Sequence, residues 1–200
     1  MMLSTKVMAM LNKYPNWFEM TAKGNFKEQL TGFADKPGLR FLQIGVFTGD
    51  ASVWLMENIL TQKDSVLEDV DTWAGSDEAE HNDMDFSDVE KTYDEKVASY
   101  KNIIKYKTDS TSYLKSLEVP TFDFIYIDGD HTAEGVLRDA VLSWRLLNPG
   151  GIIAFDDYTW IDPRGIAYQP KWSIDTFVTI VKEDSEILTV NSQVWLKKKE

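Results

Sequence analysis

Acidic side chains follow two apolar runs of the sequence, at points where buried strands are expected to end. Asp128 ends one run, and Asp156 and Asp157 end another. Hard divalent cations take oxygen ligands, and carboxylates from neighbouring strand ends can meet at one point. The pattern therefore predicts a Mg²⁺ or Mn²⁺ site formed by these three residues. For any one of them alone, the competing interpretation is a helix cap or a solvated loop residue.

A second group of small and polar residues predicts an adenosine-containing ligand. Gly45 and Gly49 lie between an apolar run and a helical pattern, which lets the backbone pass close to a ligand. Their spacing is not the G-x-G-x-x-G of dinucleotide sites. Asp71 ends the next apolar run, where it can accept both ribose hydroxyls, and Asp109 and Ser110 follow the run after that, near an adenine edge. A tight turn and two helix caps are the structural alternatives.

These residues need a scaffold that brings strand ends together, and the rest of the pattern supplies one. Short apolar runs alternate with helix-period segments, which is typical of a parallel sheet covered by helices. We expect strands at 39–45, 66–71, 103–107, 122–128 and 151–156. We expect helices at 51–60, 87–100, 112–117, 133–147 and 174–182, and a closing hairpin from 186–190 and 193–197. We predict the strand at 66–71 although the charged residues Glu68 and Asp69 interrupt its apolar run.

Length and composition indicate one globular domain. The chain has 200 residues, of which 43% are hydrophobic and 27% charged, enough to bury a substantial core. We expect a helical N-terminal addition at 1–38, ended by Lys36-Pro37-Gly38, ahead of a main domain at 39–200.

Charge and hydropathy narrow the range of partners. The net charge of −12 disfavours binding to nucleic acid. Cysteine is absent, so thiolate chemistry and disulfides are excluded. No apolar run approaches the roughly 20 residues that span a bilayer, and residues 1–11 lack the pattern of a signal peptide. We therefore expect a cytoplasmic protein without a nucleic-acid or membrane partner. The sequence leaves open whether it forms a homo-oligomer.

Five segments resemble a known family. They are Ile-Gly-Val-Phe-Thr-Gly-Asp (44–50), Val-Asp-Thr-Trp (70–73), Thr-Asp-Ser (108–110), Phe-Ile-Tyr-Ile-Asp-Gly-Asp-His (124–131) and Leu-Asn-Pro-Gly-Gly-Ile-Ile-Ala-Phe-Asp-Asp-Tyr (147–158). Together they resemble the class I S-adenosylmethionine (SAM)-dependent methyltransferases, and more narrowly the macrolide-sugar and bacterial small-molecule O-methyltransferases. The resemblance covers roughly 39–160. It implies a Rossmann-like α/β fold with a seven-stranded, mostly parallel sheet, an antiparallel last strand and helices on both faces.

The resemblance also implies roles for the cofactor residues. Gly45 and Gly49 would flank the methionine end of SAM, Asp71 would hold the ribose, and Asp109 and Ser110 would meet the adenine. Trp73 would stack on the adenine or serve in packing. The family usually has an acidic residue at the position of Gln43. The remaining predicted cofactor contacts are Gln43, Val46, Phe47, Thr48, Thr72 and Asp128.

The predicted chemistry is methyl transfer to a metal-bound hydroxyl. SAM already makes its methyl group electrophilic, so the protein must align an acceptor oxygen and remove its proton. Catechol and caffeoyl-CoA O-methyltransferases place metal-binding acids at the positions of Asp128 and Asp156, while Asp157 matches the sugar enzymes. His131 is the predicted general base, with a cap of the helix that begins at Thr132 as the alternative role. Asp130 is a second catalytic candidate. His81 is expected to be an exposed residue of a lid.

Two other functions compete with this one. The chain can be a metal-independent methyltransferase acting on nitrogen or a carboxylate, in which the aspartates only shape the pocket. It can also be a non-catalytic protein that binds SAM or a nucleotide. The acceptor, a sugar or an aromatic ring, would be shaped by residues 1–38, 73–88 and 158–172, and the last of these segments mixes aromatic and basic side chains.

Overall fold

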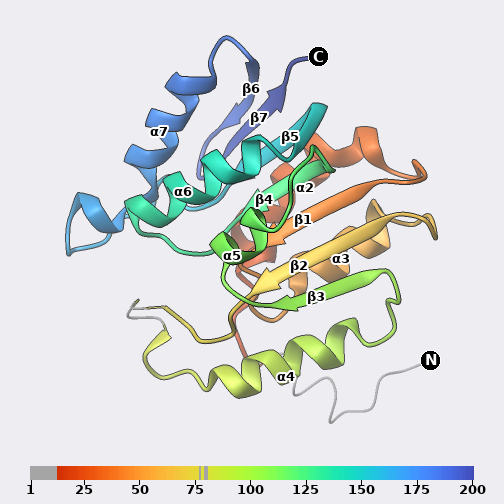
Figure 1. Ribbon diagram of the computed structural model, residues 1–200. Coiled ribbons are helices and arrows are strands. Elements are labelled where there is room, and N and C mark those ends of the chain that lie inside the picture. Colours follow the sequence, from red (N-terminus) through yellow and green to blue (C-terminus); the bar gives the residue numbers. More distant parts are fainter. Residues whose placement is uncertain (1–12, 77, 79–80) are drawn as a thin grey trace.

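A seven-stranded sheet forms the centre of the computed structural model, which describes residues 13–76, 78 and 81–200 (Figure 1). The strand order is β3-β2-β1-β4-β5-β7-β6, and β7 runs antiparallel to both of its neighbours. This arrangement confirms the predicted fold class. The strands are β1 (Arg40–Ile44), β2 (Val66–Asp71), β3 (Ile103–Lys107), β4 (Phe122–Ile127), β5 (Leu147–Phe155), β6 (Ser185–Val190) and β7 (Val194–Lys198).

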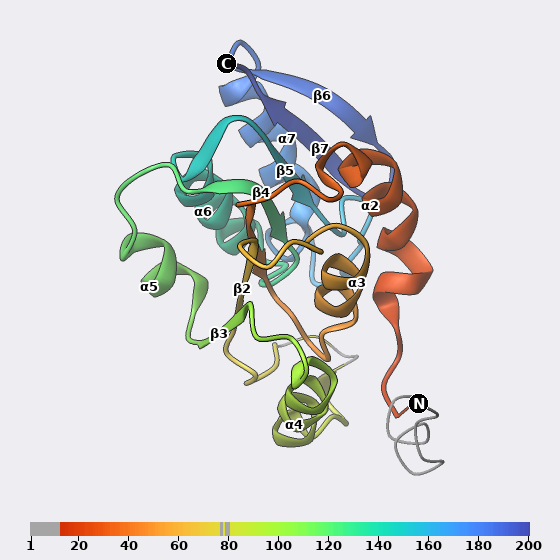
Figure 2. The same ribbon diagram turned by 90° about the vertical axis from the view of Figure 1, so that its right-hand side faces the viewer.

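Helices cover both faces of the sheet. Seen from the side, α5 and α6 lie on one face and α2 and α3 on the other (Figure 2). The helices are α2 (Lys23–Leu30), α3 (Asp50–Asn58), α4 (Phe86–Val97), α5 (Ser110–Lys115), α6 (Ala133–Trp144) and α7 (Pro170–Val181). Shorter helical turns are Phe18–Ala22, Thr31–Phe33 and Ile166–Tyr168.

The central strands β1, β2 and β4 are buried on both faces because helices cover both faces of the sheet. Neighbouring residues of β1 therefore belong to different halves of the core: Phe41 belongs to the same buried cluster as Phe26 of α2, and Leu42 to the same cluster as Val136 of α6. Alternation is the ordinary geometry of a strand, whose successive side chains point to opposite faces. Parallel strands that have helices on both faces consist of nearly continuous apolar residues, which explains why most of them could be located in the sequence.

The two acidic residues within β2 are buried, and each has partners. Glu68 pairs with Arg40 and accepts a hydrogen bond from the Tyr113 hydroxyl. Asp69 is 0% exposed and accepts a hydrogen bond of 2.9 Å from the Tyr93 hydroxyl. The strand at 66–71 is therefore confirmed despite its charged residues. Glu68 is tolerated because buried polar groups that find partners avoid most of the cost of losing water. Asp69 is satisfied only in part, since its Oδ1 is buried without a hydrogen-bond partner among the described residues.

The boundary between α6 and β5 was predicted wrongly. We expected a helix through residue 147 and a strand from residue 151, whereas α6 ends at Trp144 and β5 begins at Leu147. The buried Leu147 pairs with Phe122, and the register then shifts between Phe122 and Phe124. The Asn-Pro-Gly-Gly segment thus lies within an irregular strand, where proline is tolerated, and not in a turn.

The N-terminal part of the chain is helical where the structure describes it. The predicted helices at 1–38 appear as Phe18–Ala22 and α2, while residues 1–12 lie outside the described part. Phe26 of α2 is fully buried against the sheet, with its ring centroid 5.2 Å from that of Trp195. No described helix is both long and apolar enough to cross a membrane.

The buried carboxyl of Asp69 predicts a pH-dependent stability. Burial raises its pKa to about 7, although hydrogen bonds from Ser52 and Tyr93 favour the ionised form. The unfolded chain has a pKa of about 3.9 at this side chain. The folded state therefore holds the proton more tightly, so this contribution to stability is complete below about pH 4 and is lost as pH rises through about 7.

Asp69→Asn should remove the loss of folding stability that this carboxyl causes as pH rises through about 7. Urea unfolding at pH 5 and at pH 8 should show the variant gaining about 2 kcal/mol relative to wild type between the two pH values. Asp64→Asn, at an exposed position, is the control and should keep the wild-type pH dependence. A difference between Asp69→Asn and wild type that does not change with pH would contradict the assignment.

Candidate active site

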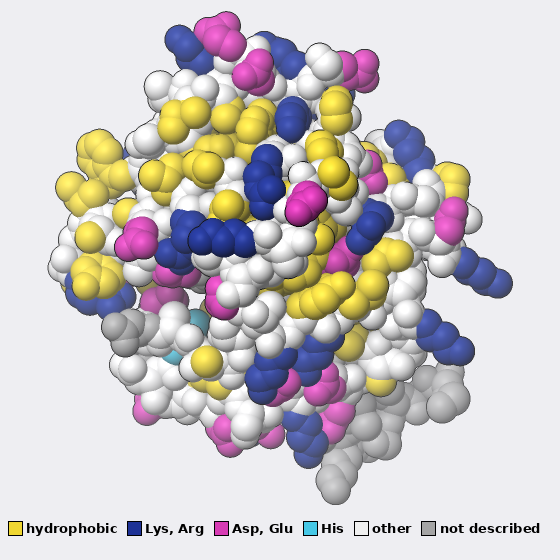
Figure 3. Space-filling view, in the orientation of Figure 1, with side chains coloured by type: hydrophobic (Ala, Val, Ile, Leu, Met, Phe, Trp, Pro, Cys, Tyr) yellow, Lys and Arg dark blue, Asp and Glu magenta, His cyan; other side chains and the backbone are white. Residues whose placement is uncertain are grey.

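A cavity of about 770 Å³ opens at the carboxyl ends of β1, β2, β4 and β5. This is the edge where parallel α/β sheets bind ligands. Histidine is visible in a hollow of the face shown in Figure 3, with acidic side chains close by. The lining includes most of the residues that the sequence pointed to, among them Gly45, Val46, Phe47, Asp71, Thr72, Trp73, Asp109, Ser110, Asp128, Asp130, His131, Asp156 and Asp157.

Gly45 allows the loop after β1 to lie against the loop after β4, and residues of both loops line the cavity. It has φ of +79°, and a Cβ atom at this position would lie 1.9 Å from the carbonyl oxygen of Asp128. Because that neighbour is backbone, no larger residue fits without moving a strand end. The loop after β1 and the loop after β4 therefore lie directly side by side, as expected where backbone must approach closely.

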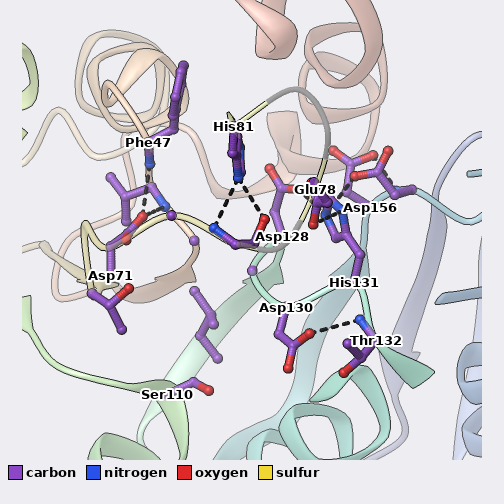
Figure 4. A pocket seen from close by; sticks show the side chains of 18 of the residues that line it. Phe47, Asp71, Glu78, His81, Ser110, Asp128, Asp130, His131, Thr132 and Asp156 are labelled. Carbon is purple, nitrogen blue, oxygen red and sulfur yellow. Dashed lines mark hydrogen bonds and ion pairs between the residues drawn. The ribbon is translucent and has the colours of Figure 1, made fainter. Parts of the chain in front are cut away.

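Asp71 holds the loop that follows β1. Its Oδ2 accepts hydrogen bonds from the backbone N–H groups of Val46 at 2.7 Å and Phe47 at 3.0 Å, and its Oδ1 accepts one from Trp73 at 2.7 Å (Figure 4). A carboxylate has about four lone-pair sites. In this conformation Asp71 therefore has room for one ribose hydroxyl, whereas we expected it to accept two.

The predicted adenine contacts lie at the beginning of α5. Asp109 is the N-cap of this helix and accepts a hydrogen bond of 2.8 Å from the backbone N–H of Ser112, so the capping alternative is correct for it. The Ser110 hydroxyl donates to Asp139 of α6 at 2.7 Å. Burial raises the pKa of Asp139 to about 6 despite that hydrogen bond. Both Asp109 and Ser110 line the cavity.

Three predicted cofactor residues do not line the cavity. Gln43 is 3% exposed and bonds to the carbonyl of Gly45, and Thr48 is 1% exposed and donates to Asp50. Gly49 has φ of +78°, and a Cβ there would lie 2.8 Å from the Tyr93 ring. These residues support the loop after β1 without lining the cavity. We infer that Gly49 is required by packing against α4.

Trp73 lines the cavity but serves mainly in packing. It is 4% exposed, and its indole N–H donates to the carbonyl of Phe47 at 3.0 Å. The ammonium of Lys105 lies 4.5 Å from the centre of its ring, and the Tyr93 ring packs against it at 4.9 Å. These contacts favour the packing role over stacking on an adenine.

His131 lies among carboxylates at the other end of the cavity. Its Nε2 is 3.0 Å from Asp157 Oδ2 and 3.8 Å from Asp128 Oδ1, and its Nδ1 is 3.1 Å from Glu78 Oε1 (Figure 4). Donor atoms of Asp128, His131 and Asp157 all lie within 4.8 Å of one another. This group, called the acidic cluster below, has the donor set and size of a cation site. His131 does not cap α6, because Thr132 does.

The charges of the acidic cluster shift one another. Burial by itself would lower the pKa of His131, but Asp128, Asp157 and Glu78 raise it well above its usual value. Burial and the charge of Asp156 raise the pKa of Asp128. Burial would raise the pKa of Glu78 too, but its contact with His131 lowers it. A proton on His131 therefore compensates part of the negative charge of these carboxylates, and a bound divalent cation would take over this compensation.

Asp156 and Asp130 were also predicted as site residues, but neither belongs to the acidic cluster. Asp156 lies beside the acidic cluster, and its carboxylate accepts hydrogen bonds from Tyr126 and from Gln193. Asp130 turns away from His131: it accepts a hydrogen bond from the backbone of Thr132 at 2.8 Å and its other oxygen lies 3.7 Å from Arg138. Its position suits a loop-fixing residue better than a catalyst.

Glu78 is the residue that the sequence did not reveal. It is 7% exposed and comes from the segment after β2, far in sequence from its partner His131. A single glutamate in an acidic stretch carries no signal of this contact. The same segment contains His81, which we expected to be exposed. It is instead partly buried, lines the cavity and lies 2.6 Å from the Ser76 hydroxyl.

A family of methyltransferase domains matches residues 42–158 of the chain, and the chain belongs to this family. It is 29% identical over 135 residues, or 66% of its length, to the uncharacterised protein R132 of Acanthamoeba polyphaga mimivirus. The alignment spans 57% of that relative.

Solved structures show the same fold. The methyltransferase PaMTH1 of Podospora anserina, bound to S-adenosylhomocysteine (SAH), has a TM-score of 0.66 and 16% identity over 99% of this chain and 89% of its own. The O-methyltransferase of Bacillus cereus, in complex with SAH, has a TM-score of 0.56 and 17% identity over 97% and 96%. MycE of the mycinamycin pathway, with Mg and SAH, has a TM-score of 0.64 and 14% identity over 98% of this chain and 54% of its own. The predicted relationship to the class I methyltransferases is confirmed.

Proposed function

We propose that this protein transfers a methyl group from SAM to a hydroxyl of a small molecule held on a divalent cation. The observation that carries the proposal is that one cavity contains both predicted sites. Asp71 lines it at one end and the acidic cluster of Asp128, His131 and Asp157 at the other, with Gly45 of the loop after β1 between them (Figure 4). A methyl group can pass only between molecules held side by side, so the shared cavity suits transfer better than binding alone.

SAM is the cofactor that fits the first end. PaMTH1 and the Bacillus cereus enzyme bind SAH, the product that SAM leaves after transfer. Here the loop after β1 presents backbone close to the cavity, and Asp71 keeps one lone-pair site for a ribose hydroxyl. A cavity of about 770 Å³ lies within the size range of ligand sites.

A Mg²⁺ or Mn²⁺ ion fits the second end. Asp128 and Asp157 bring carboxylate oxygens close together. Asp156, which lies next to Asp157 at the end of β5, is the third proposed ligand. MycE binds Mg. A divalent cation, when bound, makes a coordinated hydroxyl more acidic and orients it. The carboxylates of the chain supply the negative charge that holds such an ion.

His131 is the proposed general base. Its Nδ1 lies 3.1 Å from Glu78 Oε1, and its Nε2 faces the carboxylates that would hold the metal and the acceptor. A carboxylate behind an imidazole sets the orientation of the ring and stabilises the cation that forms when Nε2 takes up a proton. We assign Glu78 to that role, which the sequence did not predict.

The acceptor side of the cavity is aromatic and charged. It includes Trp17, Trp160 and Tyr168, and the guanidinium of Arg164 lies 4.1 Å from the centre of the Tyr168 ring. Flat faces with a few polar groups suit a sugar or an aromatic ring. A screen of sugars and phenols with SAM, followed as SAH formation, identifies which class is methylated.

Asp71→Ala should weaken SAH binding by at least about tenfold, a loss of roughly 1.4 kcal/mol. The variant loses both the ribose acceptor and the hydrogen bonds that hold the loop after β1. Isothermal titration calorimetry with SAH measures the change. Asp64→Ala, at an exposed position away from the cavity, should bind as wild type does. Equal affinity in Asp71→Ala would remove this residue from the cofactor site.

Removal of divalent metal should abolish methyl transfer while leaving most of the SAH binding in place. The reason is that the acidic cluster and Asp71 lie at different ends of the cavity. Activity is measured after treatment with excess EDTA and again after addition of Mg²⁺ or Mn²⁺, which should restore it. Full activity in EDTA would support the metal-independent alternative, transfer to nitrogen or to a carboxylate.

His131→Ala should lower turnover by a factor of about 10² to 10⁴, the usual contribution of a general base. SAH affinity should change little, because the histidine lies at the metal end of the cavity. Turnover at saturating SAM and SAH calorimetry on the same preparation separate the two effects. A fully active variant would leave His131 with a structural role only.

A further inference from the structure

The carboxylate of Asp156 is held by two neutral donors. The hydroxyl of Tyr126 on β4 donates to its Oδ2, and the side-chain amide of Gln193 donates to the same oxygen at 3.0 Å. Tyr126 is 1% exposed and Gln193 is 0% exposed. One donor comes from β4 and the other from the turn between β6 and β7, and both reach Asp156 inside the protein, away from solvent.

The amide of Gln193 has only one orientation that satisfies its neighbours. Its Oε1 accepts hydrogen bonds from the indole N–H of Trp195 at 2.9 Å and from the amide of Asn25 at 2.7 Å. The indole N–H can only donate. Rotating the amide by 180° would place donors against a donor, so its Nε2 must face Asp156.

This arrangement leaves little freedom to the carboxylate itself. Two donors use both lone pairs of Oδ2, and Oδ1 accepts a third hydrogen bond of 2.8 Å from the backbone N–H of Asp157. One lone pair of Oδ1 is left. Among the described residues, Asp156 takes part in no ion pair with Lys, Arg or His. A carboxylate that is fixed in place, lines the cavity and has no cationic side-chain partner is suited to hold a metal ion.

We infer that Gln193 and Tyr126 are positioning residues that orient Asp156 as a ligand of the divalent cation. This inference rests on the proposed function, because it needs the metal. Groups that hydrogen-bond to ligands fix their direction, and losing them typically lowers metal affinity by about 10-fold to 100-fold. The hairpin of β6 and β7 therefore contributes to the active site through Gln193, although no residue of these strands lines the cavity.

The test is Mn²⁺ binding to the full chain, measured by calorimetry without SAM or acceptor. Gln193→Met keeps the length of the side chain but removes the donor to Asp156 and the acceptor for Trp195 and Asn25, whereas Tyr126→Phe removes only a hydroxyl. Each should weaken Mn²⁺ binding by about 10-fold to 100-fold. SAH binding should stay within about twofold of wild type in both, since Asp71 lies at the other end of the cavity.

Gln29→Met is the matched control. Gln29 of α2 donates to Thr189 of β6 at 2.9 Å, so it also links a helix to the hairpin by one amide, but it does not touch Asp156. It should bind Mn²⁺ as wild type does, even if it loses as much stability in urea as Gln193→Met. Wild-type Mn²⁺ affinity in both Gln193→Met and Tyr126→Phe, or equal weakening in Gln29→Met, would overturn the inference while leaving the proposed function intact. No Mn²⁺ binding by wild type itself would overturn both.

Discussion

The close approach of two strand ends at Gly45 and Asp128 is the constraint on which the site depends. The backbone N–H of Asp128 donates to the carbonyl of Ile44 at 2.8 Å, and that of Gly45 donates to the carbonyl of Val70 at 3.0 Å. At this point β1 is paired on both sides, and its loop must leave between its neighbours. Only glycine allows this without moving Asp128. The loop after β1 and the acidic cluster thereby share one cavity.

Much of this arrangement could be predicted because parallel strands follow a simple rule. Their carboxyl ends meet at one edge of the sheet, so Asp71, Asp109, Asp128 and Asp156 could be placed near each other from position along the chain alone. Their detailed roles could not. Asp109 caps a helix and Asp71 holds backbone N–H groups, and both uses depend on loop conformations that composition does not determine. The β5 boundary failed for a related reason, because the pairing of Leu147 with Phe122 overrode a local turn signal.

Contacts between residues that are far apart along the chain could not be predicted from the sequence. Glu78 meets His131, and Gln193 meets Asp156, in each case across dozens of residues. Glutamate and glutamine in these positions look like ordinary surface or hairpin residues. What distinguishes them is burial, which the fold imposes. The same holds for Glu68 and Asp69 of β2, whose partners Tyr113 and Tyr93 come from α5 and α4.

Backbone strain is concentrated around the cavity. Of the four described non-glycine residues with positive φ, Phe47, Trp73 and Asp157 line it, at +52°, +47° and +54°. Aspartate adopts this region with little penalty, but bulky aromatic residues do so rarely. Phe47 and Trp73 are held there by the hydrogen bonds of their backbone N–H groups to Asp71. A single carboxylate therefore stabilises two unfavourable backbone conformations, so the shape of the cofactor end depends on Asp71 even before a ligand arrives.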